Sequence, residues 1–388
     1  MSSGFFYRVK EDYFFYALVF FLASYFFLPT SKMVNNVYYA LLALPALVYV
    51  LRSRFLAFKI SYMVFLWLAL LLVYCISAVF NGVGLQYYKH LLYIFLFLSI
   101  CVFFVKSDLL FSNGFYRFSF WLVSFYVVLS AIFYWLTGRY GFGERVIWLP
   151  ARMSGPIYTS MLISALFSAA LPVWIKQKRY LELLSAFVIS FFCMSFILQS
   201  RSGIVAMFFV VFVYFAYLFY DRKGAFYIVF FSVFSLLSLF LIYYFSESIP
   251  VVDQLVRRAD SGRFELWSLL LQDFEGCSYL LGCGTDFKSE RLMYGTHPIN
   301  HAHNIFLALL VHTGILALAL FLLICVSALY LAFISKSYWG LYLLSSIVAL
   351  NFDGSQLIGN PDELWMLVLL PIFMIMLKST KLSQESSR

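Results

Sequence analysis

The chain has 388 residues, of which 64% are hydrophobic and 22% aromatic, while only 12% are charged, and its formal net charge is +9. The apolar share exceeds what a water-soluble core needs, and the cations form no basic stripe of the kind that binds nucleic acid. The ten-residue alternating strands of a membrane barrel are also absent from the sequence. The composition therefore predicts an all-α polytopic membrane protein.

Apolar runs between charged residues or Gly, Pro and Asn breaks predict about 12 transmembrane helices, since one crossing takes about 20 apolar residues. The runs lie at 13–29, 37–51, 60–80, 90–105, 118–136, 155–175, 181–199, 203–220, 225–245, 314–335, 338–351 and 364–377. The sequence has no clear repeat and no hydrophilic stretch large enough for a separate soluble domain, so residues 1–388 are expected to form a single integral membrane domain. The first residues lack the features of a cleaved signal, so the first helix is expected to be retained.

Lys and Arg place the N-terminus in the cytoplasm, because most of them then lie on the cytoplasmic side. Two outer segments, 137–153 and 246–302, break this rule together. Such cations either contact lipid headgroups or hold an anionic ligand such as a phosphate. The second segment is the longest connection in the chain and is expected to be a folded, functional periplasmic loop. Within it, 264–273 reads as a short amphipathic helix and 282–284 as a turn.

The same loop contains Cys277 and Cys283, in a place where a bacterial periplasm would permit a disulfide. The sequence leaves a disulfide and two free thiols both open. The other four cysteines lie in apolar runs and are expected to be small core residues.

Two arginines stand where a cation needs an explanation. Arg201 interrupts two apolar runs at the outer face, where a guanidinium is costly unless it is paired. It is either a snorkelling residue at a turn or a clamp for a diphosphate, which its bidentate fork suits. Arg263 and Trp267 lie four residues apart on the predicted loop helix and share a face. They form either a surface cation–π contact or a phosphate contact beside a ring that stacks on a sugar.

His303 and Asn304 come directly before the tenth membrane segment. An imidazole at an aqueous mouth can act as a base near neutral pH, although a capping role explains the pair equally well. His312 is expected to make only packing or polar contacts, because on a straight helix it would face away from His303. Asp353 begins an outer connection, 353–363, that is rich in carboxylates and amides. These groups suit sugar hydroxyls, or they are simply solvated.

The sequence contains no metal-ligand spacing and no nucleotide-binding fingerprint. If the chain is an enzyme, it is therefore expected to use no metal and no cofactor, and to take its driving force from the substrate.

In order, these motifs resemble the O-antigen ligase and O-antigen polymerase superfamily of bacterial envelopes. The resemblance covers about residues 195–335. Its elements are Ser-Arg at 200–201, Gly-Arg followed by Trp at 262–267, Gly-x-Gly at 282–284 and His-x-His-Asn at 301–304. The ligase-type spacing is met by His303, Asn304 and Gly314 and departs at Ala317.

The resemblance implies glycan transfer on the periplasmic face of the bacterial inner membrane, from a donor that is an undecaprenyl-diphosphate-linked oligosaccharide. Arg201 and Arg263 match the arginines that contact the diphosphate, and His303 matches the proposed base. Arg258 and Arg152 are weaker candidates for the same anion. Trp267, Asn304 and Asp353 are expected to contact the glycan weakly.

A polymerase and a ligase differ in the acceptor, which is another lipid-linked repeat unit or lipid A-core. Chains rich in Phe and Tyr, here 47 and 29 residues, look like the polymerases, so a polymerase is favoured. The ligase is the alternative. A flippase or other transporter would show charges or broken helices near mid-membrane in both halves, which this sequence lacks. Membrane lipids and a co-polymerase that regulates chain length are the expected partners.

Overall fold

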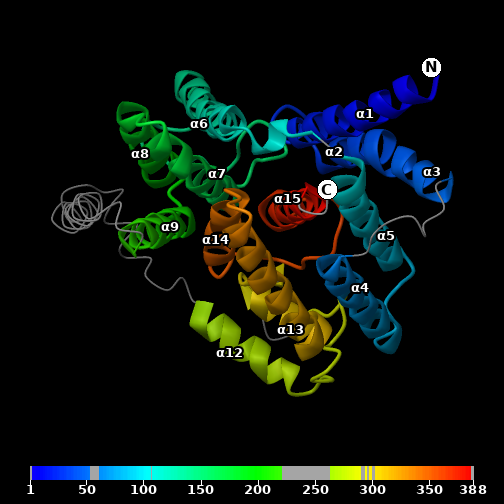
Figure 1. The fold of residues 1–388 in the computed structure, drawn as a ribbon. Coiled ribbons are helices and arrows are strands. Elements are labelled where there is room, and N and C mark those ends of the chain that lie inside the picture. Colours follow the sequence, from blue (N-terminus) through cyan, green and yellow to red (C-terminus); the bar gives the residue numbers. More distant parts are fainter. Residues whose placement is uncertain are drawn as a thin grey trace. The chain divides into compact units, whose positions relative to one another are not determined.

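The computed structural model describes residues 2–52, 61–105, 107–220, 263–289, 293–294, 297–298 and 302–385. In these ranges, nine helices are long and apolar enough to cross a membrane, and two shorter apolar helices cover Tyr13–Ser24 and Trp339–Ala349. The predicted all-α polytopic class is confirmed (Figure 1). The predicted helix 225–245 lies outside the described residues, as do 246–262 and a few later positions of segment 246–302.

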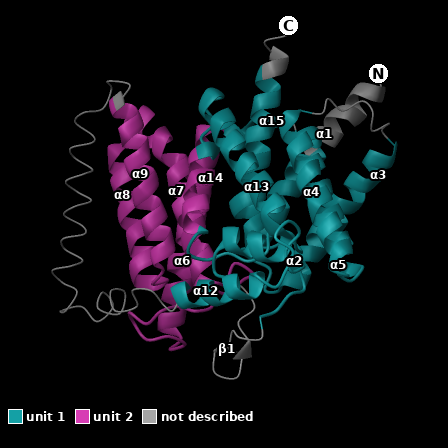
Figure 2. Ribbon diagram, turned by 90° about the horizontal axis from the view of Figure 1, so that it is seen from below, with its two compact units in different colours: residues 1–111, 262–340, 350–388 teal, residues 112–261, 341–349 magenta. Residues whose placement is uncertain are grey.

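The chain divides into two compact units, drawn in teal and magenta in Figure 2. Unit 1 contains residues 1–111, 262–340 and 350–388, and unit 2 contains residues 112–261 and 341–349. The single integral domain expected from the sequence stays a prediction.

Unit 1 is built around its C-terminal helix. Its elements are α1 (Ser2–Ser24), α2 (Ser31–Tyr38), η1 (Tyr39–Ala43), α3 (Leu44–Arg52), α4 (Tyr62–Phe80), α5 (Gln86–Ser99), η3 (Ile100–Phe104), η4 (Leu109–Phe111), α12 (Arg263–Phe274), β1 (Met293–Tyr294), β2 (His297–Pro298), α13 (Ile305–Ile334), η6 (Trp365–Leu369) and α15 (Leu370–Glu385). The apolar stretch that η6 and α15 form is 72% buried, and α15 packs against α13 and η3. In this core, the ring of Phe97 packs against the rings of Trp365 and Phe373.

Unit 2 is built around α7. Its elements are α6 (Asn113–Leu136), α7 (Pro156–Lys176), α8 (Tyr180–Phe192), η5 (Cys193–Ile197), α9 (Arg201–Tyr220) and most of α14 (Trp339–Ala349). Helix α7 is 89% buried and packs against α6, α8 and α9. Small residues permit this close packing. At Gly203 of α9, an added Cβ would come 2.6 Å from the Ser160 carbonyl oxygen, so only glycine fits there.

The tenth predicted segment begins earlier than expected. The sequence predicted a helix over 314–335, whereas α13 runs from Ile305 to Ile334 with a kink at Gly314. The apolar run is thirty residues long and exceeds one crossing of about 20 residues, so composition alone could not fix its start. Consequently, His303 and Asn304 lie directly against the helix that follows them.

Candidate functional site

The N-terminus of α13 is closed by bonds within the protein. Asn304 is the N-cap, and its Oδ1 accepts from the backbone N–H of Phe306 at 2.9 Å and of Leu307 at 3.1 Å. The N–H of Ile305 donates to the Leu350 carbonyl at 3.1 Å. The first three N–H groups of α13 are thus engaged, although a free helix N-terminus commonly binds anions. An anion at this end has to be held by side chains.

His303 precedes the cap in an unusual backbone conformation. Its φ is +49°, in the left-handed region that residues other than glycine seldom adopt. Its Nδ1 lies 2.9 Å from Oδ1 of Asp353, and the two side chains are 32% and 6% exposed. A carboxylate oxygen accepts, so a hydrogen bond here requires the ring hydrogen on Nδ1. The contact with Asp353 therefore fixes the orientation of the imidazole.

A close backbone approach places Asp353 beside His303. The Asn304 side chain donates from Nδ2 to the Asn351 carbonyl at 3.3 Å. A Cβ added at Gly354 would come 2.7 Å from the backbone nitrogen of Ile305. Glycine at 354 thus lets the 350–354 segment lie directly on the start of α13, and this carries the Asp353 carboxylate to the imidazole.

Helix α12 packs on the same end of α13. Its buried face consists of Leu266, Leu270 and Phe274, at the spacing of an amphipathic helix, and it forms one cluster with Ala302, Ala308 and Val311. The short helix predicted at 264–273 is confirmed. Arg263 opens α12 one turn before Trp267, and the Trp267 indole donates from Nε1 to the Ala302 carbonyl at 2.9 Å. The predicted anion residue is therefore on a helix that contacts the residue before His303.

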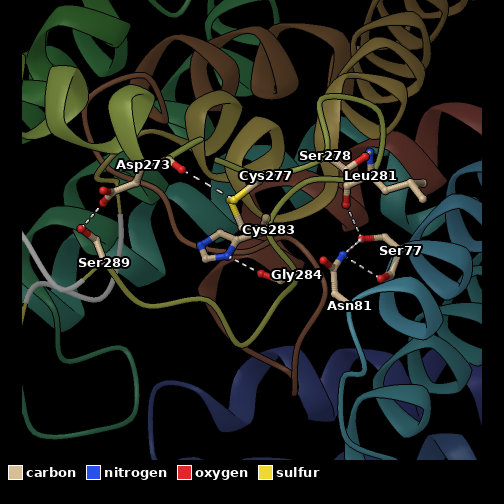
Figure 3. Close-up of a disulfide and its surroundings, with 10 residues drawn as sticks. Ser77, Asn81, Asp273, Cys277, Ser278, Leu281, Cys283, Gly284 and Ser289 are labelled. Atoms are coloured by element: carbon tan, nitrogen blue, oxygen red, sulfur yellow. Dashed lines mark hydrogen bonds between the residues drawn. A yellow bond between two sulfur atoms is a disulfide. The ribbon is translucent and has the colours of Figure 1, made fainter. Parts of the chain in front are cut away.

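After α12, the chain forms a small loop closed by a disulfide between Cys277 and Cys283, shown in Figure 3. The alternative that the sequence left open is resolved in favour of the disulfide. Across the loop, the N–H of Gly282 donates to the Ser278 carbonyl at 2.7 Å. Ser77 of α4 donates from its hydroxyl to the Leu281 carbonyl at 2.6 Å, which fixes the loop to unit 1.

The disulfide loop supplies hydrogen bonds where α13 is broken. Gly314 has φ +84° and ψ 180°, so the regular helical ladder is interrupted there. Loop residues bond to the groups on both sides of the break. These bonds run from Cys283 N to Val311 O (2.8 Å), from Gly284 N to His312 O (3.0 Å) and from Ile315 N to Tyr279 O (2.9 Å). The loop therefore supplies backbone hydrogen bonds on both sides of the kink.

Gly314 and His312 of α13 both lie in close contact with the disulfide loop. A Cβ at Gly314 would overlap the Leu280 carbonyl, so this position requires glycine both for its φ and for space. His312 is buried and its Nδ1 lies 3.0 Å from the Gly284 carbonyl oxygen. The prediction that His312 makes a polar packing contact is confirmed.

Arg201 lies in unit 2, at the first position of α9. The turn before it contains Gln199 with φ +45°, and the Ser160 hydroxyl donates to the Ser200 hydroxyl at 2.6 Å. Arg145 donates from Nε to the Leu198 carbonyl at 3.0 Å, so a second cation reaches this turn. Arg145 is not among the candidate residues that the sequence predicts. The cation excess of segment 137–153 was the signal that could have found it.

The structure thus brings four predicted residues together in unit 1: His303, Asn304, Asp353 and Trp267. Arg263 is on the helix that carries Trp267, and Arg258 lies outside the described residues. Asn304 caps α13, Asp353 bonds His303 and Trp267 bonds a backbone carbonyl. Their contacts with a glycan stay predictions.

Comparison with known proteins supports the resemblance. Residues 185–322 match the family model described as O-antigen ligase. The matched segment includes Arg201, Arg263, Trp267 and His303. No curated protein matches the chain.

Proposed function

We propose, from the match of residues 185–322 to the family model described as O-antigen ligase, that the chain is a glycosyltransferase acting at the periplasmic face of the bacterial inner membrane. It transfers a glycan from an undecaprenyl-diphosphate-linked oligosaccharide to a sugar hydroxyl of another lipid-linked repeat unit. The observation that carries the proposal is the His303–Asp353 pair at the start of α13, packed beside the helix that Arg263 opens.

In the proposed reaction, Nε2 of His303 accepts the proton of the acceptor hydroxyl. The hydroxyl oxygen forms a bond to the anomeric carbon of the donor while the bond from that carbon to the diphosphate oxygen breaks. The electron pair leaves with undecaprenyl diphosphate, and the anomeric configuration inverts. Asp353 holds the ring in the tautomer that accepts on Nε2 and stabilises the imidazolium that forms.

The leaving diphosphate gains negative charge, and this charge has to be met by fixed cations. The first N–H groups of α13 are already engaged, which favours side-chain guanidinium groups for this task. Arg263 supplies one of them in unit 1. Arg201 is proposed to contact the diphosphate as well, on the strength of the family motif alone. A guanidinium forks onto two phosphate oxygens and keeps its charge at any physiological pH.

The acceptor separates a polymerase from a ligase. The Phe- and Tyr-rich composition favours the polymerase, whereas the description of the matching family favours the ligase. Ala317 stands where the ligase-type spacing has Gly, Thr or Tyr, so the polymerase remains our first choice. A co-polymerase that regulates chain length is the proposed partner, on the family resemblance alone.

The banding of lipopolysaccharide from a strain that lacks this chain tests the proposal. A core that carries a single repeat unit supports a polymerase, because ligation still proceeds. Bare core with long lipid-linked polymer contradicts the polymerase and supports the ligase. Bare core with unpolymerised units retained at the cytoplasmic face would instead indicate transport, and unchanged banding would reject all three functions.

A further inference from the structure

We infer that Trp267 is a positioning residue for His303, and that it acts through the hydrogen bond from its indole N–H to the Ala302 carbonyl. The inference rests on the proposed role of His303 as the base. It assigns Trp267 a task that differs from the sugar stacking expected from the sequence.

The hydrogen bond lies in a sheltered place. Ala302 is 3% exposed, and Trp267 is half-buried against the cluster that α12 forms with the start of α13. The bond is 2.9 Å long, which is normal for a well-formed N–H donor. A buried carbonyl that loses its donor bears an uncompensated desolvation cost. The segment would therefore move if the indole N–H were removed.

The residue next to this carbonyl is the one whose geometry matters. His303 holds a φ of +49° without being glycine, so its backbone needs restraint from both sides. On the C-terminal side, Asn304 is fixed by the helix cap and by Asn351. On the N-terminal side, the bond from Trp267 fixes Ala302. Without that bond, the backbone can relax toward an ordinary φ and swing the imidazole away from Asp353.

The same helix links the base to the leaving group. Arg263 lies four residues before Trp267, which is about one turn or 6 Å along α12. A helix that contacts the donor diphosphate at one turn and the His303 segment at the next would orient both groups as one rigid piece.

Replacing Trp267 with Phe separates the two roles of the ring. Phe keeps an aromatic face for stacking on a sugar but has no N–H. Trp339→Phe is the matched control, because Trp339 also donates from Nε1 to a carbonyl, that of Leu110 at 3.1 Å, beyond the far end of α13. If Trp267→Phe does not fold, benzothienylalanine at 267 removes only the N–H and leaves the shape of the ring.

Two measurements on purified full-length protein test whether Trp267 positions His303. Backbone hydrogen–deuterium exchange in a peptide spanning 302–307 should be faster in Trp267→Phe than in the wild type or in Trp339→Phe. With lipid-linked repeat units as substrate, kcat should fall about 10- to 100-fold while KM changes little, because a misplaced base costs rate rather than binding.

The outcomes separate this inference from the proposed function. Unchanged exchange and unchanged kcat in Trp267→Phe overturn the inference. A normal Trp267→Phe with a raised KM in Trp267→Ala also overturns it, in favour of sugar stacking. If exchange is faster in Trp267→Phe but the wild type transfers no glycan to either acceptor, the structural link to His303 is supported. In that case only the proposed function is rejected.

Discussion

Asp353 makes the most direct contact with the imidazole that we propose as the base. Replacing it with Asn keeps the shape but adds an N–H₂ that can donate to Nδ1. The ring would then favour the tautomer that carries its proton on Nε2 and cannot accept there. We expect Asp353→Asn to lower kcat about 100-fold or more with little change in KM. Initial rates of glycan transfer by the purified enzyme measure this.

Asp362→Asn is the matched control, because it lies in the same connection and caps the N–H of Leu364 from Oδ1 at 3.0 Å. An amide oxygen can still accept that bond, so this variant should retain activity. A wild-type kcat in Asp353→Asn would remove Asp353 from the mechanism and leave it as a structural residue.

The two arginines and His303 can each be tested by substitution with alanine. Arg201→Ala, Arg263→Ala and His303→Ala should each lower glycan transfer about 100-fold or more, because each removes charge stabilisation or proton transfer from the transition state. The variants should remain inserted in the membrane and abundant, which immunoblotting of membrane fractions checks. Normal polymer from any two of the three would reject the site.

Gly314 sets the shape of the element that carries the site. Its φ of +84° with ψ near 180° is a region that residues with a Cβ occupy only at a cost of about 1–3 kcal/mol, before the overlap with the Leu280 carbonyl is counted. We expect Gly314→Ala to lower the thermal unfolding midpoint in detergent and to abolish transfer. Gly114→Ala is the control, because nothing lies within 4 Å of its added Cβ. Equal midpoints for the two variants would show that the kink tolerates alanine at position 314.

The disulfide gives a second prediction for the same element. Cross-linking two residues six positions apart stabilises the loop by about 2 kcal/mol, by restricting the unfolded chain. A Cys277→Ser, Cys283→Ser double variant should therefore have a lower thermal unfolding midpoint. It should also show faster hydrogen exchange in the loop and around Gly314. Reduction of the wild type should reproduce this shift. A double variant with wild-type exchange around the kink would mean that the hydrogen bonds suffice without the sulfur bridge.

The helices could be predicted from sequence because a bilayer demands long apolar runs, and α12 because its apolar residues recur at helical spacing. The start of α13 could not be predicted, because its apolar run is longer than one membrane crossing. Gly314, in the middle of the run, does not indicate which part of it spans the membrane. His303 was singled out, but its bond to Asp353 joins residues fifty positions apart. Pairs at such separation depend on the tertiary fold, and a single sequence contains no pattern that reveals them.

At the scale of the whole molecule, the proposal requires the site end of α13 to face the periplasm. The bias of Lys and Arg puts the connection between α7 and α8 in the cytoplasm and the segment that contains α12 outside. Both regions offer an exposed residue for labelling, Gln177 in the first and Glu265 in the second. The native cysteines make a low background, because two form a disulfide and the other four lie in apolar helices.

We therefore expect Glu265→Cys to react with a membrane-impermeant maleimide in cells whose outer membrane alone is permeabilised. Gln177→Cys should react only after the inner membrane is disrupted, because its thiol would face the cytoplasm. The wild type serves as the blank, and a mass shift on a gel reports labelling. If Gln177→Cys reacted first and Glu265→Cys only after disruption, the orientation would be inverted. His303 would then open toward the cytoplasm, and transfer between periplasmic lipid-linked units could not take place at this site.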